Sequence, residues 1–209
     1  MTHVVVKHII TVIEIRAYNE RVACPQPRGV KYTQPPDAAP LPVAALAFTG
    51  EDAENARAFA EAFSLPAGGK AAAGATLHVH VERTAAEELR RDAQSGLFHE
   101  EGYTIRFADP ESATLHVAGR RGLRNAVATL AAVVEHNCPR AGLEISDAPR
   151  FGIRGFIEGY YGTPWSPAAR RELIRLMARY KMNSYFYAPK DDLYHRKPWR
   201  EPYDPHSLQ

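Results

Sequence analysis

The order of elements between residues 150 and 189 restricts the possible folds more than any other feature of this 209-residue chain. An extended apolar run leads into FIEGYYGTPW at residues 156–165, a helix-forming segment follows at 166–183, and a strand-like run, SYFYAP, occupies 184–189. Two strands of one sheet that are joined through a helix have a right-handed crossover and lie parallel. The sequence therefore predicts a βαβ unit in an α/β protein.

The helix predicted at 166–183 has clear signals at its start. Ser166 suits the N-cap position, because its hydroxyl can accept a hydrogen bond from the first turn, and Pro167 suits the first helical position. Apolar side chains then repeat at the i, i+3, i+4, i+7 spacing of one helix face: Leu173, Leu176, Met177 and Tyr180. We expect this face to be the buried one.

Polar residues gather where each of the two predicted strands ends. Glu158 and Gly159 follow the first strand, and KDDLYHRKPWREPY at 190–203 follows the second. The carboxyl ends of parallel strands share one edge, where sites in α/β sheets and barrels are found, so we predict that both clusters face the same rim. Gly159, without a side chain, would let a ligand reach the backbone, and Tyr160 and Tyr161 offer flat faces that suit a sugar ring.

The sequence segments at these strand ends resemble the start of the catalytic barrel of glycoside hydrolase family 84. RGFIEGYYGTPWS and, one βα unit later, NSYFYAPKDDLYHRKPWREPY carry the likeness, which covers residues 150–205. The preceding region resembles the family's non-catalytic domain through TLHVAGRRGLRNAVATLAAVVE. The family consists of β-N-acetylglucosaminidases, including protein O-GlcNAcases, so the resemblance implies hydrolysis of terminal β-linked N-acetylglucosamine by a substrate-assisted retaining mechanism.

The resemblance also implies roles for two residues. The main chain of Gly159 would hydrogen-bond a sugar hydroxyl, and the ammonium of Lys190 would donate to sugar hydroxyls. Tyr160 stands where the family often has phenylalanine, which is a mild departure. The implied partner is a glycoconjugate that bears N-acetylglucosamine, and no cofactor or metal is expected.

Asp191 and Asp192 form the only Asp–Asp pair of the chain, but the resemblance places the catalytic pair on a later strand end. We therefore expect a structural role for this pair, close to Lys190, and assign no catalytic residue. A (β/α)8 barrel needs roughly 250 residues. Residues 150–209 supply only the first two βα units, so we expect an incomplete barrel, and an N-terminal portion of an enzyme that is inactive alone.

The region before the barrel, residues 1–149, mixes strands and helices and is expected to form a separate non-catalytic α/β domain. Apolar patterning predicts strands at 3–16, 43–50, 76–82, 102–107 and 113–119, and helices at 51–65, 84–94 and 120–137. The prolines of the stretch at 24–42 argue against regular structure and predict a loop or an extended connection.

Composition argues against several other classes of function. The 26 basic and 24 acidic residues are interspersed and give a net charge of +2, which makes no case for nucleic acid. Cys24 and Cys138 form neither a disulfide framework nor a metal site and are expected to be free thiols. His78 and His80 alternate along a strand without a third ligand, so a solvated strand face is expected there.

The amino-terminal stretch MTHVVVKHIITVIEIR is apolar, but Lys7, His8 and Glu14 interrupt it and no cleavage site follows. No window has the length of an uncharged membrane span. These features favour a cytoplasmic protein and leave its oligomeric state open.

Three functions fit the sequence. The first is a β-N-acetylglucosaminidase whose catalytic pair lies beyond this chain. The second is a non-catalytic carbohydrate-binding or interaction module that keeps half of a sugar pocket. The third is an inactive remnant. Binding of N-acetylglucosamine by the chain alone would favour the second, whereas a downstream Asp–Asp pair would favour the first.

Overall fold

The computed structural model of the chain describes residues 29–33, 42–65, 74–92, 98–159, 161, 165–188, 190 and 201. The chain divides into two compact units. Unit 1 comprises residues 1–152 together with Arg179–Lys181, and unit 2 comprises Ile153–Ala178 and Met182–Gln209. The strand predicted at 3–16, Cys24 and most of the proline-rich stretch at 24–42 lie outside the described residues.

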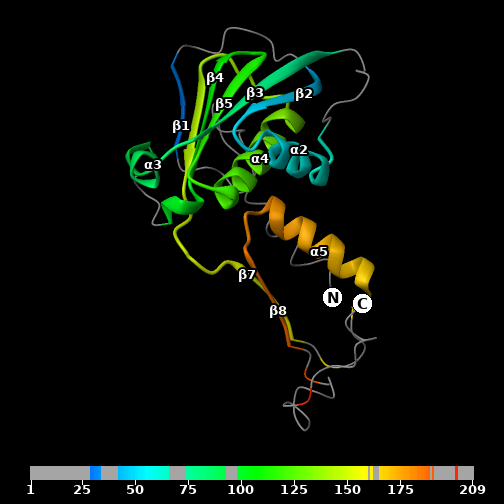
Figure 1. Ribbon diagram of the computed structural model, residues 1–209. Coiled ribbons are helices and arrows are strands. Elements are labelled where there is room, and N and C mark those ends of the chain that lie inside the picture. Colours follow the sequence, from blue (N-terminus) through cyan, green and yellow to red (C-terminus); the bar gives the residue numbers. More distant parts are fainter. Residues whose placement is uncertain are drawn as a thin grey trace. The chain divides into compact units, whose positions relative to one another are not determined.

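Unit 1 is built on a six-stranded mixed sheet with the order β1-β6-β4-β5-β3-β2 (Figure 1). Strands β2, β3 and β5 run parallel, whereas β4 is antiparallel to both β5 and β6, and β1 is antiparallel to β6. The strands are β1 Gly29–Tyr32, β2 Val43–Gly50, β3 Ala75–Arg83, β4 Tyr103–Asp109, β5 Ser112–Val117 and β6 Leu143–Asp147.

Helices α2 (Ala53–Ala62) and α4 (Arg120–Glu135) pack against each other and against one face of this sheet (Figure 1). A short helix, α3 (Ala86–Asp92), and a 3-10 turn, η1 (His99–Glu101), complete the unit. Strand β3 shows how the core is separated from solvent. Its residues Leu77, Val79 and Val81 are buried, and the histidines between them are exposed. His78 and His80 thus lie on a solvated face, as the sequence predicts.

Among the described residues, the helices and strands predicted from 43 onward are confirmed, with ends that move by a few residues. The prediction for 24–42 is wrong in part, because Gly29–Tyr32 form strand β1, which pairs with β6 and contains no proline. The hairpin turns between β4 and β5, as the strands predicted at 102–107 and 113–119 imply, and the Asp109 carboxylate stabilises the turn by accepting hydrogen bonds from the amide of Glu111 and the hydroxyl of Ser112. Helix α4 is buried over most of its surface and not along a single face, since polar Asn125 and Thr129 also point into the protein and find partners there.

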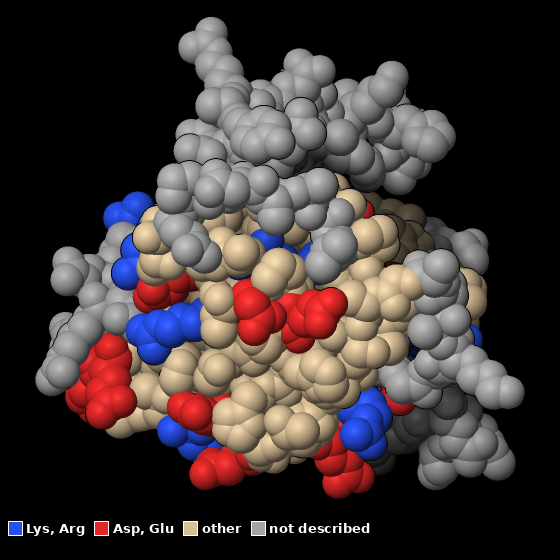
Figure 2. Space-filling view, turned by 90° about the horizontal axis from the view of Figure 1, so that it is seen from above, with Lys and Arg blue, Asp and Glu red and all other residues tan. Residues whose placement is uncertain are grey.

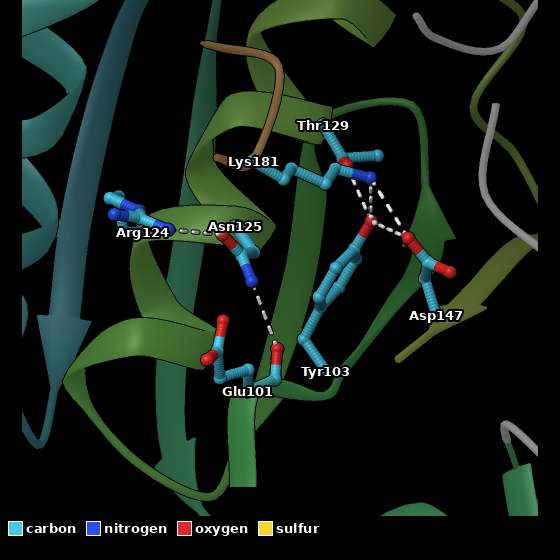
Figure 3. Close-up of polar contacts among 7 residues, drawn as sticks. All are labelled: Glu101, Tyr103, Arg124, Asn125, Thr129, Asp147 and Lys181. Atoms are coloured by element: carbon cyan, nitrogen blue, oxygen red, sulfur yellow. Dashed lines mark hydrogen bonds and ion pairs between the residues drawn. The ribbon is translucent and has the colours of Figure 1, made fainter. Parts of the chain in front are cut away.

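A buried polar cluster joins the sheet of unit 1 to residues 179–181 (Figure 3). The ammonium of Lys181 donates to the Tyr103 hydroxyl at 2.8 Å and to the Asp147 carboxylate at 3.0 Å. The Tyr103 hydroxyl also lies 2.5 Å from that of Thr129. Burial, and then the Asp147 charge, raise the pKa of Tyr103 well above its ordinary value. Arg179, two residues before Lys181, forms an ion pair with Glu135 of α4.

Unit 2 contains strand β7 (Gly155–Glu158), helix α5 (Pro167–Arg179, whose last residue is counted with unit 1) and strand β8 (Ser184–Tyr187). The two strands pair parallel, with Gly155 opposite Ser184 and Glu158 opposite Tyr187, which confirms the predicted strand–helix–strand order and direction. Ser166 caps α5 as predicted, because its hydroxyl accepts a hydrogen bond from the amide of Ala169 at 3.2 Å.

The face of α5 that was expected to be buried is covered only in part. Met177 is 6% exposed, whereas Leu176 remains 50% exposed. The outward sides of β7 and β8 likewise leave Ile157 and Phe186 at 65% and 48% exposure. The two parallel strands and one helix that the structure describes in unit 2 do not enclose these side chains.

The surface seen in Figure 2 carries its lysine, arginine, aspartate and glutamate side chains in small separate groups and not in one field of a single sign. Within the described residues, no helix combines the length and the apolarity that crossing a membrane requires.

Candidate functional site

The carboxyl ends of β7 and β8 lie side by side in unit 2. Strand β7 ends at Glu158, strand β8 ends at Tyr187, and these two residues are register partners. The amide of Ala188 donates to the Glu158 carbonyl at 3.1 Å, so the pairing continues one residue beyond β8. Gly159 and Lys190, the two residues predicted to contact sugar, follow these adjacent ends, and both are exposed.

Lys190 is in contact with the segment that follows β7. Its ammonium lies 4.8 Å from the centre of the Tyr161 ring, which is 66% exposed. A cation over an exposed aromatic face gains about 0.5–1 kcal/mol, enough to bias the position of a long and flexible side chain. The polar groups after the two strands are therefore brought together at least through this pair.

Gly159 and Gly155 are glycines for different reasons. A side chain at Gly155 would collide with the carbonyl oxygen of Ser184 on the paired strand. At Gly159 the φ angle is not positive, and an added Cβ would meet only ordinary contacts, 3.5 Å from a methyl carbon of Ile157 and 3.8 Å from the Ala188 carbonyl. The fold therefore requires a glycine at 155 but not at 159, where the missing side chain leaves the exposed main chain open to a molecule from outside.

Glu158, next to Gly159, has a fully buried side chain that is surrounded by donors. Arg170 of α5 donates from Nε to Oε2 at 2.9 Å and from Nη2 to Oε1 at 3.0 Å. The hydroxyl of Tyr185 on β8 donates to Oε2, and the amide of Trp165 lies 3.4 Å from Oε1. A buried carboxylate is stable only with such partners.

Aromatic rings extend this arrangement on both sides. The guanidinium of Arg170 lies over the Tyr187 ring, 4.6 Å from its centre, and Tyr187 is 42% exposed. Trp165, just before α5, stacks on Phe156 of β7 with ring centres 5.6 Å apart. Sequence patterns did not single out Arg170 or Tyr185. The signal that was available was Glu158 itself, a carboxylate at the end of an apolar strand, which needs a cationic partner nearby.

Several residues named from the sequence lie outside the described part of the chain: Tyr160, Asp191 and Asp192, together with most of the polar cluster at 190–203. Their roles stay predictions. Cys138 is buried and takes part in no disulfide bond among the described residues. No group of three or more histidine, cysteine, aspartate or glutamate side chains suited to a metal ion occurs among the residues that the structure describes.

Comparison with known proteins adds a family to this geometry. A family model described as beta-N-acetylglucosaminidase matches residues 154–209, which begins next to the first residue of unit 2 and includes the ends of both strands. Protein O-GlcNAcase of Rattus norvegicus is 44% identical over 63 residues, 30% of this chain and 7% of the rat protein. Protein O-GlcNAcase of Mus musculus is 50% identical over 56 residues, 27% of this chain and 6% of the mouse protein.

Solved structures match a larger share of the chain. CpGH84B superposes with a TM-score of 0.63 and 26% identity, over 93% of this chain and 33% of its own. A GH20 exo-β-N-acetylglucosaminidase from Vibrio harveyi, solved with N-acetylglucosamine, shares the fold with a TM-score of 0.54 and 18% identity, over 83% of this chain and 26% of its own. The chain thus spans a third or less of the length of these relatives. Together, these matches relate the chain to the β-N-acetylglucosaminidases of glycoside hydrolase family 84.

Proposed function

We propose that residues 150–209 are the first two βα units of a (β/α)8 barrel, preceded by a non-catalytic domain at 1–149. In this proposal the chain is part of a β-N-acetylglucosaminidase that removes terminal β-linked N-acetylglucosamine. The observation that carries the proposal is the coincidence of two independent features. The stretch that matches the family is the stretch in which two parallel strands end beside each other with an open glycine and a lysine.

Gly159 and Lys190 supply sugar contacts in this proposal. The main chain at Gly159 bonds a sugar hydroxyl, which the absence of a Cβ permits. The ammonium of Lys190 carries three donors, and its contact with the Tyr161 ring leaves donors for sugar hydroxyls. The exposed ring of Tyr161 offers an apolar surface of the kind on which a pyranose can lie.

The reaction itself is proposed to be substrate-assisted and retaining, an exception to the scheme in which an enzyme carboxylate is the nucleophile. The acetamido oxygen of the substrate attacks the anomeric carbon, while one carboxylate orients the acetamido group and a second protonates the leaving oxygen. We assign neither role to this chain. Its part is to bind and orient the sugar, and Asp191 and Asp192 are proposed to be structural.

Titration of the 209-residue chain with N-acetylglucosamine tests the binding half of the proposal. Saturation-transfer NMR is expected to show contact in the wild type, and a contact weakened at least about tenfold in both Gly159→Ala and Lys190→Ala. Lys31→Ala is the matched control, since Lys31 is an exposed lysine of unit 1. Equal binding by all four proteins would remove the site assignment.

A chromogenic N-acetylglucosaminide tests the catalytic half. The chain alone is expected to bind this compound and not to hydrolyse it. Hydrolysis that is lost in Asp191→Asn or Asp192→Asn would show that the structural role proposed for this pair is wrong.

A non-catalytic carbohydrate-binding module is the second candidate. The observation in its favour is that both proposed sugar contacts lie in a chain that spans 33% of CpGH84B. Binding by the chain alone favours a module over an inactive remnant, but the proposed enzyme fragment is also expected to bind, so binding without turnover does not separate the module from the enzyme. Turnover by a longer polypeptide that contains this chain would favour the enzyme.

A further inference from the structure

The connection between β7 and α5 is held at both ends by a single side chain. Glu158, at its start, receives a hydrogen bond from the amide of Trp165, at its end, with a separation of 3.4 Å. The same carboxylate bonds Arg170 of α5 and Tyr185 of β8. The buried Glu158 carboxylate therefore links β7, α5 and β8, and it lies directly before Gly159 in the chain.

Arg170 has the geometry of a clamp and not that of a surface ion pair. It contacts both oxygens of Glu158 through two different nitrogens, and the Glu158 side chain is fully buried. Paired hydrogen bonds of this kind fix orientation as well as distance. The Tyr187 ring, 4.6 Å from the guanidinium carbon, restricts the same group from another side.

The orientation of Glu158 determines that of the next peptide group. The Glu158 side chain is fixed by Arg170 and Tyr185, and its carbonyl accepts the Ala188 amide at 3.1 Å. Little freedom is left for the peptide bond that leads to Gly159. Gly159 has no side chain of its own that could fix its main chain, and its surroundings leave space for a Cβ. Its conformation therefore depends on its neighbour.

A role in stability alone would not require ions here. Replacing a buried ion pair by apolar residues of similar volume is often neutral or stabilising, so the pairing of buried Glu158 with partly buried Arg170 is weak evidence for a contribution to stability. Polar networks of this kind are instead well suited to keeping a binding group in one geometry, because supporting residues decide how accurately a site is positioned.

We propose that Arg170 is a positioning residue: acting through Glu158, it fixes the main chain at Gly159 in the conformation that receives the sugar. The identity of the ligand as a sugar rests on the proposed function. The positioning of the Gly159 main chain by Arg170 does not depend on it. Arg170 touches no substrate in this proposal. Its effect on the sugar is indirect, through Glu158, and Tyr185 of β8 supports the same carboxylate with a further hydrogen bond.

The structural half is tested first, without ligand, by the backbone amide NMR signal of Gly159 in the 209-residue chain. Arg170→Met is expected to shift or broaden this signal, and Arg170→Lys, which keeps the charge but not the paired geometry, is expected to do so less. Arg175→Met is the matched control, because Arg175 lies on the same helix, is exposed and pairs only with exposed Glu172 among the contacts described. A Gly159 signal that is identical in Arg170→Met and in the control would overturn the inference.

The functional half is tested by the affinity for N-acetylglucosamine. Arg170→Met is expected to weaken binding at least about tenfold and Arg170→Lys about threefold, with Arg175→Met unchanged. Weaker binding with an unaltered Gly159 signal would overturn the proposed route through Glu158. If the wild type binds no sugar but its Gly159 signal responds to Arg170→Met, the positioning role stands and the proposed function fails.

A milder variant covers the case in which Arg170→Met does not fold. Tyr185→Phe removes one donor to Glu158 and leaves both bonds from Arg170 in place. It is expected to change the Gly159 signal and the affinity in the same direction as Arg170→Lys. No response of either quantity in folded Tyr185→Phe and Arg170→Lys would overturn the inference.

Discussion

The Lys181 ammonium lies 3.0 Å from the Asp147 carboxylate, and both side chains are almost wholly enclosed in unit 1. Arg179 is the last residue of helix α5, yet residues 179–181 belong to unit 1, and Lys181 is buried there. The pair also lies beside the Tyr103 hydroxyl, which receives a hydrogen bond from Lys181 (Figure 3). Three residues far apart in the sequence therefore form one buried polar group.

Lys181→Met is expected to destabilise the chain by about 3–5 kcal/mol, because it leaves the Asp147 carboxylate buried without its cation. Urea unfolding followed by circular dichroism measures the change. The double variant Lys181→Met with Asp147→Leu should recover much of the loss, since no charge is left behind. Lys31→Met, which removes an exposed partner of Glu144, is the control and should cost less than about 1 kcal/mol.

Stability should fall at alkaline pH because of Tyr103. Its folded pKa is raised above the ordinary 10.0, so the contribution is fully present below about pH 10 and is lost as pH rises through the folded value. The reason for the sign is that the unfolded chain releases the phenolic proton at lower pH than the native chain does. Urea unfolding at increasing pH should therefore show a steeper alkaline decline in the wild type than in Tyr103→Phe. Equal slopes would contradict this account.

Replacement by alanine should affect stability at Gly155, within β7, and sugar affinity at Gly159, just after β7. Gly155→Ala should destabilise the chain by about 1–3 kcal/mol, because the new Cβ overlaps the Ser184 carbonyl. Gly159→Ala should stay within about 0.5 kcal/mol of the wild type and lose affinity for N-acetylglucosamine. Thermal unfolding and sugar titration of both variants separate the two effects. A large loss of stability in Gly159→Ala would show that the glycine serves the fold.

Lys190→Ala tests the second proposed contact in a polypeptide that contains a whole barrel. Its kcat/KM for an N-acetylglucosaminide should fall at least about tenfold, which corresponds to about 1.4 kcal/mol of lost transition-state binding. Lys190→Arg keeps the charge and should recover part of the rate. Unchanged kinetics in Lys190→Ala would remove this residue from the site.

Local patterns predicted much of the fold. Alternation of apolar and polar residues predicts strands such as β3, and the N-cap Ser166 with the proline after it predicts the start of α5. These signals can be read from the sequence because they depend only on residues that are close together in the chain. The parallel pairing of β7 and β8 followed from the crossover rule. The same rule placed Gly159 and Lys190 at adjacent strand ends.

Partners distant in the sequence were not predictable in this way. Asn125 and Thr129 of α4 are buried, because the amide of Asn125 donates to the carbonyl of Glu101 and the hydroxyl of Thr129 bonds that of Tyr103. Lys181, just after helix α5, is also buried. Its burial depends on a carboxylate that comes from another strand, and no periodicity records such a pair.

The contrast between Gly155 and Gly159 also bears on how genes of this kind change over time. The backbone of β8 leaves no space for a side chain at the first glycine, so selection for a stable fold favours glycine there. The second is under no such restraint from the fold and would be free to drift once a descendant stopped recognising sugar. Comparing the two positions across descendants would then be informative. Substitution at 159 together with a conserved glycine at 155 would mark lineages that kept the fold and lost sugar binding.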